Sequence, residues 1–188
     1  DVFQFLKELH IRILKELQLN PNLLEKEFKD IKFFIKKQKK KKEKTTKALA
    51  KFQSYGEILS SKIVSAQLIS IGINAKALHA GDIGLITNED YANAEPLKKS
   101  YILLKKSIAQ LNCTPIITGF IGKTEQGNTT TLGRGGSDYS AAIIGNAIDA
   151  EEIQIWTDVD GILSADPKII LKAKTIPEVS FAEASELA

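Results

Sequence analysis

The sequence has almost no sulfur-containing residues and no long apolar run. One of its 188 residues is cysteine, Cys113, and none is methionine, so no disulfide can form within the chain. A chain without disulfides is typical of the cytosol, and no apolar stretch approaches the ~20 residues of a membrane span. No signal peptide opens the sequence. We therefore expect a cytoplasmic protein that does not contact a membrane. Because the chain starts at Asp1 without an initiator methionine, we expect it to be a fragment.

Arginine is also scarce. Of the 26 basic residues, only Arg12 and Arg134 are arginines, and the others are lysines. Residues 1–55 carry 15 basic and 7 acidic side chains, whereas the remainder is net acidic. Seven of these lysines fall in residues 36–44. We interpret this run as a solvated helix end or loop, with binding to an anionic polymer as the alternative. No aromatic residue interleaves with the lysines for base stacking, so no nucleic acid partner is expected.

Apolar periodicity predicts helices alternating with short strands. Helices are expected over residues 2–19, from Pro21 with Asn20 as N-cap, and over 54–72, 97–111 and 137–148. Strands are expected over 74–78, 115–120 and 152–158, and a hairpin over 120–132 that turns at 125–128. Trp156 is expected in the core. Such alternation favours an α/β fold with a parallel sheet. Residues 1–53 would form a helical region attached to a core of residues 54–188.

The stretch TTTLGRGGSDYSAA, residues 129–142, surrounds Arg134 with three glycines just before a predicted helix. Glycines adopt positive φ and expose backbone N–H groups, which together with a helix N-terminus form an anion site. The planar guanidinium of Arg134 matches a carboxylate or phosphate. Asp138 suits the orientation of a lysine or of a metal–phosphate group. The alternative is a plain glycine turn in which Ser137 or Asp138 caps the helix.

The stretch TDVDGILSADP, residues 157–167, follows a predicted strand and contains three aspartates. A nucleotide-binding loop with Thr157 and Asp158 at the strand end is one interpretation, and ordinary turn chemistry is another. A calcium loop opened at Asp158 would need glutamate at its twelfth position, where Ile169 stands.

Ser54 and Glu57 have the spacing of a capping box, which taken alone makes Glu57 structural. The two histidines, His10 and His79, lack metal-ligand spacing, and no protein metal site is expected.

Several of these stretches closely resemble the aspartate kinases of the amino acid kinase superfamily. They are GFIG (119–122), residues 129–142 and WTDVDGILSADPKI (156–169), while YGEILSS (55–61) is similar to the family's F-G-E-R-L-S segment. Residues 1–53 resemble only a variable helical insertion. The resemblance implies a three-layer α/β/α sandwich with a mainly parallel sheet. It also implies transfer of the γ-phosphoryl group of ATP, with Mg²⁺ carried by the nucleotide, to the side-chain carboxylate of L-aspartate. This reaction is the first step towards lysine, threonine and methionine.

The resemblance also implies residue roles on the aspartate side. Glu57 would hold the amino group of aspartate, and Arg134 would clamp a carboxylate. Ser137 and the backbone of Gly135 and Gly136 would complete a pocket that Phe120 lines. Asp138 would organise lysines and the phosphoryl region, so Arg134 and Asp138 are the expected catalytic residues.

The implied nucleotide contacts are Thr157, Asp158, Leu163 and Lys168. The family commonly has tyrosine at the position of Leu163 and arginine at that of Lys168. The family's K-F-G-G-T motif, the lysine of its F-G-A-K-V-L-H-P segment and its ACT domains are absent from the sequence, so the fragment alone is expected to be inactive. The full-length protein is expected to be a homo-oligomer. The alternatives are another kinase of the superfamily or a catalytically dead amino-acid- or nucleotide-binding module.

Overall fold

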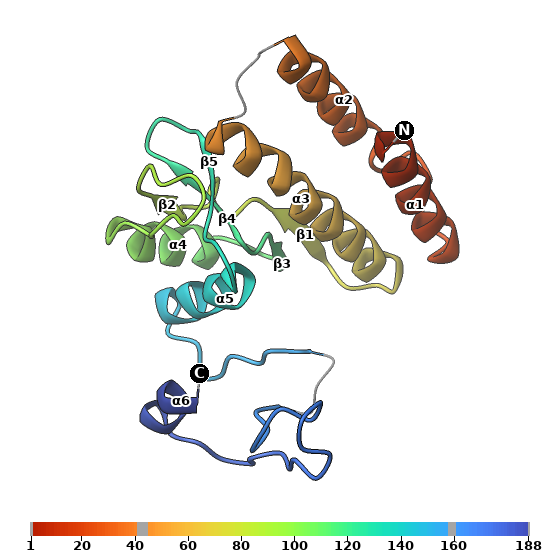
Figure 1. Cartoon of the computed structure of the whole chain (residues 1–188). Coiled ribbons are helices and arrows are strands. Elements are labelled where there is room, and N and C mark those ends of the chain that lie inside the picture. Colours follow the sequence, from red (N-terminus) through yellow and green to blue (C-terminus); the bar gives the residue numbers. More distant parts are fainter. Residues whose placement is uncertain (1, 41–44, 158–160, 188) are drawn as a thin grey trace. The chain divides into compact units, whose positions relative to one another are not determined.

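Two groups of short strands are separated and flanked by helices along the chain (Figure 1). The computed structural model describes residues 2–40, 45–157 and 161–187, and it divides into two units, Asp1–Ile153 and Gln154–Ala188. The helices are α1 (Val2–Glu16), α2 (Glu25–Lys40), α3 (Thr46–Ser70), α4 (Lys99–Ala109), α5 (Gly136–Ala147) and α6 (Phe181–Leu187). The strands are β1 (Ala75–Leu78), β2 (Ile86–Thr87), β3 (Thr114–Ile117), β4 (Ile121–Thr124) and β5 (Thr129–Thr131).

The strands of the first unit are mainly parallel. β1 pairs with β3 in parallel, β2 pairs with β4 in parallel, and β4 pairs with β5 as an antiparallel hairpin. The expected α/β class and the expected hairpin are both confirmed. The strands form two sheets, β1–β3 and β2–β4–β5. Because β1 and β3 run in the same direction, their carboxyl ends lie at one edge of the two-stranded sheet, where Leu78 is the partner of Ile117. Ligands of open α/β sheets bind at this edge.

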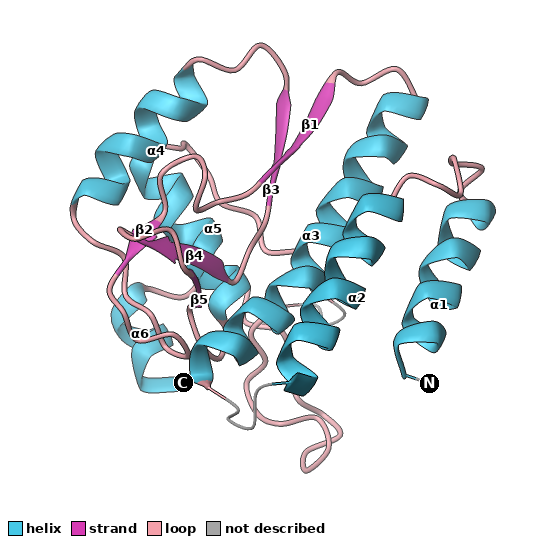
Figure 2. Cartoon of the chain, turned by 90° about the horizontal axis from the view of Figure 1, so that it is seen from above, coloured by secondary structure: helices cyan, strands magenta, loops and turns pink. Residues whose placement is uncertain are grey.

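Helices cover both sides of the strands (Figure 2). On one side α3 packs on β1, β3, β4 and β5, with α2 against its outer face; on the other side α5 packs on β4, and α4 packs on β2 and α5. One apolar core joins α1, α2 and α3 and is made by Leu14, Leu24, Phe28, Ile31, Tyr55, Ile58, Leu59, Ile63 and Ile121. A second core lies under α4 and α5 and includes Leu85, Leu104, Leu132 and Ile143. Burial of each such side chain contributes about 1.5–3 kcal/mol.

Two predicted helix starts are wrong. The Asn20 side chain accepts a hydrogen bond from the Asn22 amide at 2.9 Å, so it closes a local turn, and α2 begins only at Glu25. The third helix begins at Thr46, where Thr45 accepts a bond from the Ala48 amide at 3.1 Å, and it continues through the expected boundary between residues 53 and 54. Ser54 is therefore not a cap. Its hydroxyl donates to the Lys51 carbonyl at 2.7 Å within the helix. The helix starts before Ser54 because the residues that precede it are good helix formers.

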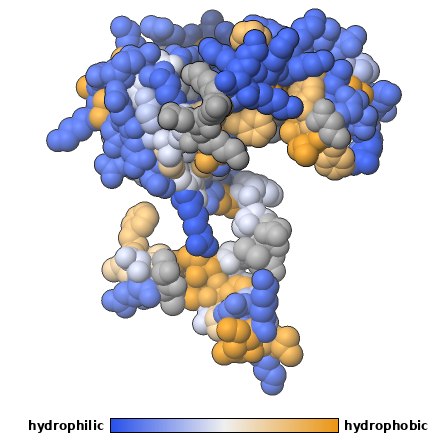
Figure 3. Space-filling model, turned by 45° about the horizontal axis from the view of Figure 1, so that its top comes forward, coloured by the Kyte–Doolittle hydropathy of each residue, from blue (hydrophilic) through white to orange (hydrophobic). Residues whose placement is uncertain are grey.

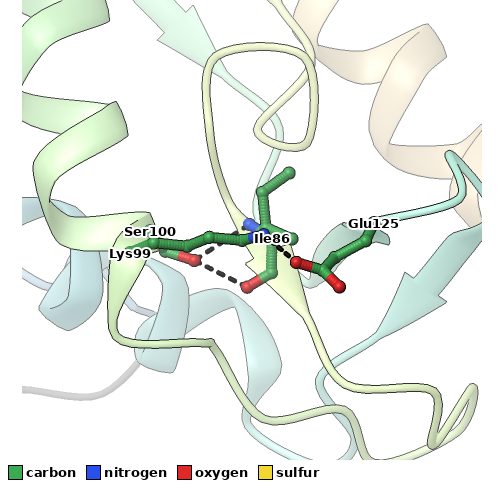
Figure 4. Close-up of polar contacts among 4 residues, drawn as sticks. All are labelled: Ile86, Lys99, Ser100 and Glu125. Carbon is green, nitrogen blue, oxygen red and sulfur yellow. Dashed lines mark hydrogen bonds and ion pairs between the residues drawn. The ribbon is translucent and has the colours of Figure 1, made fainter.

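The N-terminus of α4 anchors the β2 strand and the hairpin turn (Figure 4). The Ser100 hydroxyl accepts from the Ile86 amide at 3.0 Å and donates to the Ile86 carbonyl at 2.6 Å. The neighbouring Lys99 forms an ion pair with Glu125 in the turn between β4 and β5. On the strands themselves, the buried hydroxyls of Thr87 and Thr130 lie 2.8 Å apart in a hydrogen bond. These contacts hold in place the hairpin from which the glycine-rich loop emerges.

The second unit has little regular structure besides α6. Residues 152–157 form no strand, so the expectation of a buried strand there is wrong, and its last residue, Asp158, lies outside the described residues. Trp156 is 89% exposed and not in the core, with its indole N–H donating to the Gln154 side chain at 3.2 Å. An apolar run becomes a strand only when another strand satisfies its backbone groups, and the strand pairings among the described residues do not include residues 152–157. Apolar side chains consequently show on the surface of this unit (Figure 3).

Candidate active site

A tight turn, residues 118–120, follows β3 at the carboxyl edge of the sheet. Thr118 is buried, and its hydroxyl accepts a hydrogen bond from the Ala80 amide at 3.0 Å, which joins this turn to the loop after β1. Phe120 has a φ of 63°. This left-handed conformation is uncommon for a residue with a side chain, and such residues concentrate at functional sites.

The same turn is docked on the first turn of α5. The Phe120 amide donates to the Ser140 hydroxyl at 2.8 Å, and the Phe120 carbonyl accepts from the Leu132 amide at 2.8 Å. Ser140 in turn donates to the Gly136 carbonyl at 2.7 Å. Phe120 is therefore fixed through both of its backbone polar groups.

The glycine-rich loop needs its glycines for two different reasons. Gly133 and Gly135 have φ values of 78° and 69°, which residues with a Cβ atom rarely adopt. At Gly136 the reason is space, because a Cβ atom there would lie 2.8 Å from Cδ2 of Phe120. Gly135 is the N-cap of α5 and the helix starts at Gly136. Ser137 and Asp138 thus lie in the first helical turn, and the alternative in which one of them is the cap is wrong.

Glu57 of α3 reaches this turn from the opposite side of the sheet edge. Partial burial raises the pKa of the Glu57 carboxyl, and a hydrogen bond from the Gly119 backbone opposes that rise. Gly119 also contacts the start of α5, since a Cβ atom on it would lie 3.1 Å from the Ser137 hydroxyl. The structure therefore brings together Glu57, Phe120, Gly136 and Ser137, four of the residues that the sequence singled out.

Arg134 and Asp138 flank this group and are exposed. Within the described residues, neither side chain makes a hydrogen bond or an ion pair. A guanidinium and a carboxylate therefore stand at the N-terminus of a helix, where the helix dipole favours negative ligands, and both can engage a ligand without first breaking an internal contact.

Two lysines, Lys51 and Lys123, lie with His79 and Asp82 near the end of β1, although no sequence motif indicated them. Partial burial lowers the pKa of the Lys51 ammonium, and the nearby charge of Lys123 lowers it further. Lys123 forms an ion pair with Asp82. His79 is partly buried, and burial lowers the pKa of its imidazole, with Asp82 opposing this effect. These groups come from α3, β4 and the loop after β1, so no linear motif could have revealed them. Clustered cations attract anionic ligands.

The expected nucleotide contacts belong to the second unit, apart from Asp158, which lies outside the described residues. Leu163 forms an isolated β-bridge with Thr175. The backbone amide of Lys168 donates to the Asp166 carboxylate at 2.8 Å, while the Lys168 side chain is exposed. Thr157 is exposed as well. Within one unit, the structure therefore holds Leu163 in a β-bridge and Lys168 in a local turn.

The described residues contain neither a metal-binding cluster nor a membrane-spanning helix. No three or more His, Cys, Asp or Glu side chains among them lie close enough together to hold a metal ion. None of the helices there has the length and apolar character needed to cross a membrane.

Aspartokinases match most or all of this chain. The chain is 40% identical to aspartokinase 1, chloroplastic, from Arabidopsis thaliana over all of its residues, which is 34% of that protein. It is 42% identical to aspartokinase 1 from Bacillus subtilis over 72% of its residues and 33% of that protein. The chain thus spans about a third of the length of these relatives.

Solved structures agree in fold. The E. coli aspartokinase III complex with aspartate and ADP superimposes with a TM-score of 0.85 at 31% identity, covering 98% of this chain and 42% of that one. The same enzyme with lysine and aspartate gives a TM-score of 0.81. The sequence profile of the amino acid kinase family matches residues 10–188. The chain belongs to the amino acid kinase family.

Proposed function

We propose that the protein containing this chain is an aspartate kinase. It transfers the γ-phosphoryl group of Mg-ATP to the side-chain carboxylate of L-aspartate and forms 4-phospho-L-aspartate, the first step towards lysine, threonine and methionine. The observation that carries the proposal is the meeting of Glu57, the Gly119–Phe120 turn and the start of α5, with Arg134 beside it.

The charges at this place complement an amino acid with two carboxylates. The Glu57 carboxylate binds the α-ammonium group, and burial of Glu57 makes that ion pair stronger than one in water. Arg134 binds one carboxylate in a bidentate manner. The N-terminus of α5 adds positive potential beside Ser137 and the glycine backbone. The related E. coli aspartokinase III was crystallised in complex with aspartate and ADP, in agreement with this ligand set.

The nucleotide binds through the second unit. Thr157 and Asp158 contact the nucleotide, Leu163 packs on the adenine, and the Lys168 ammonium binds a phosphate. The leucine side chain cannot form a hydrogen bond, so Leu163 contacts the adenine only by van der Waals packing. Asp138 is exposed and has no ion-pair partner among the described residues, so it is available to orient lysines around the phosphates. Mg²⁺ bound to the nucleotide supplies neutralising charge at those phosphates.

Phosphoryl transfer requires positioning more than covalent chemistry by the protein. An oxygen of the aspartate side-chain carboxylate attacks the γ-phosphorus in line, the bond to the β–γ bridging oxygen breaks, and ADP leaves. Glu57 and Arg134 hold and orient the acceptor. The protein forms no covalent intermediate.

Trapping of the acyl phosphate tests this function directly. Hydroxylamine converts an acyl phosphate into a stable hydroxamate, which ferric iron detects by colour. We expect the full-length protein to form hydroxamate with Mg-ATP and L-aspartate and far less with L-glutamate. Hydroxamate formed with glutamate but not with aspartate would assign the protein to another carboxylate acceptor of the family. Binding of both ligands without any hydroxamate would indicate a catalytically dead module.

A further inference from the structure

Ser140 is the buried hydroxyl that connects the Phe120 turn to α5, and none of the roles assigned above includes it. Its side chain is 2% exposed. It accepts from the Phe120 amide at 2.8 Å and donates to the Gly136 carbonyl at 2.7 Å, so both of its hydrogen-bonding capacities are used at good distances. One hydroxyl thus bridges two segments that lie twenty residues apart in the sequence.

The position of this bridge gives it a consequence for the pocket. Phe120 has a left-handed backbone, which a non-glycine residue keeps only when its surroundings hold it there. The bond from its amide to Ser140 fixes the peptide between Gly119 and Phe120. The Gly119 backbone in turn hydrogen-bonds to Glu57, and the Phe120 ring lies against Gly136. The Ser140 hydroxyl therefore helps to fix both the Gly119 backbone beside Glu57 and the Phe120 ring beside Gly136.

We propose that Ser140 is a positioning residue of the aspartate pocket: it holds Phe120 in its left-handed conformation and thereby places the Gly119–Phe120 turn against Glu57 and the start of α5. The aspartate pocket itself is part of the proposed function, on which this inference rests. Ser140 does not touch the substrate, and its effect reaches aspartate through residues 119 and 120. The nucleotide contacts belong to the other unit and do not depend on this bond.

Substitution of Ser140 by alanine removes the acceptor without adding volume. Alanine is a better helix former than serine, so α5 itself does not lose helical propensity. The Phe120 amide, in contrast, loses its partner, and an unsatisfied buried donor is costly. In the full-length protein, Ser140→Ala should raise KM for aspartate about tenfold and leave KM for ATP within about twofold. A matched control is Ser61→Ala, because Ser61 is also a buried helical serine but donates only to the Ile58 carbonyl in its own helix.

Hydrogen exchange of the Phe120 amide gives a second reading that does not need catalytic activity. In Ser140→Ala this amide should exchange at least about tenfold faster than in the parent protein, whereas Ser61→Ala should leave its rate unchanged. If the alanine variant fails to fold, Ser140→Cys replaces it, because a thiol is a weaker partner for an amide and should give a smaller change in the same direction.

The outcomes separate the two proposals. If the parent protein does not phosphorylate aspartate, the proposed function fails, while the exchange rate of the Phe120 amide still tests whether Ser140 holds the turn. An unchanged KM for aspartate in Ser140→Ala would overturn the inference. Equal increases of KM for aspartate and ATP, or the same increase in Ser61→Ala, would also overturn it, because they indicate a general structural effect.

Discussion

At the scale of single residues, the site keeps Glu57 in a position that costs folding free energy. Burial raises the pKa of its carboxyl above the ordinary value of 4.5, and a hydrogen bond from the Gly119 backbone compensates in part. A group whose pKa is higher in the folded than in the unfolded state destabilises the fold when it is ionised. Glu57 therefore opposes folding at neutral pH, and this opposition disappears as the pH falls through the raised pKa. The proposed binding of the aspartate ammonium group is a functional reason for such a placement.

Replacement of this carboxylate should separate stability from activity. We expect Glu57→Gln to keep or increase the thermal stability at pH 7, because the buried charge is gone, and to decrease kcat/KM for aspartate at least about tenfold. In the parent protein, kcat/KM for aspartate should fall as acid protonates Glu57, with an apparent pKa above 4.5. A pH series of kcat/KM together with melting curves measures both effects.

The exposed Glu95 provides the control for this substitution. Glu95→Gln should change neither the thermal stability nor kcat/KM for aspartate. A Glu57→Gln variant that melts at a much lower temperature, yet uses aspartate normally, would show that Glu57 serves the fold and not the substrate.

At the scale of elements, an ion pair joins α2 to α3. Glu27 is 6% exposed and pairs with Lys62, which is more accessible. The second carboxylate oxygen of Glu27 is buried and has no hydrogen-bond partner within the described residues. Loss of Lys62 would leave a buried charge uncompensated, which is one of the more costly changes that a single substitution can cause. The pair thus adds a charged contact to the apolar packing of α2 on the helix that carries Glu57.

A comparison of two lysines tests this docking. We expect Lys62→Met to lower the free energy of unfolding by about 2 kcal/mol, which is less than for a fully buried pair because Lys62 is partly exposed. The control is Lys29→Met, whose partner Glu25 lies 2.9 Å away on the exposed face of α2, and this change should cost less than about 0.5 kcal/mol. Urea unfolding measures both variants. Equal losses in the two would contradict the role of the Glu27–Lys62 pair.

Elements whose signals are local could be predicted from the sequence. The helix over 97–111, the helix over 137–148 and the hairpin depend on apolar periodicity and a turn sequence, and the structure confirms them. The expected capping box at Ser54 was wrong because the same Ser-x-x-Glu spacing also occurs inside a longer helix. The strand over 152–158 could not be judged from its own residues, because a strand depends on a partner elsewhere in the chain.

The candidate site also contains residues that the sequence reveals locally and residues that only the folded chain brings together. The glycine-rich loop could be recognised because its glycines, Arg134, Ser137 and Asp138 are adjacent in sequence. From the residues alone, Glu57 was the glutamate of a capping box with Ser54, and only the family resemblance suggested a ligand for it. Ser140 is one of several serines in the chain, and its bond to the Phe120 amide exists only once α5 and the turn after β3 have come together.

At the scale of the whole molecule, the residues proposed for the two substrates belong to different units of the chain. Glu57, Phe120, Arg134 and Ser137 lie within Asp1–Ile153, whereas Thr157, Leu163 and Lys168 lie within Gln154–Ala188. If each unit serves one substrate, a substitution in one unit should affect mainly the kinetics of its own substrate. This separation makes the central proposal accessible to steady-state kinetics.

The most direct test compares Arg134→Lys with Lys168→Ala in the full-length protein, with each substrate varied while the other is saturating. Arg134→Lys keeps the charge but loses the planar fork, so kcat/KM for aspartate should fall about tenfold to a hundredfold while KM for ATP stays nearly constant. Lys168→Ala should instead raise KM for ATP about tenfold, and Arg12→Lys, at the other, exposed arginine, should change neither. If Arg134→Lys raises KM only for ATP and leaves the aspartate constants intact, the glycine-rich loop binds nucleotide phosphate and the proposed aspartate pocket is wrong.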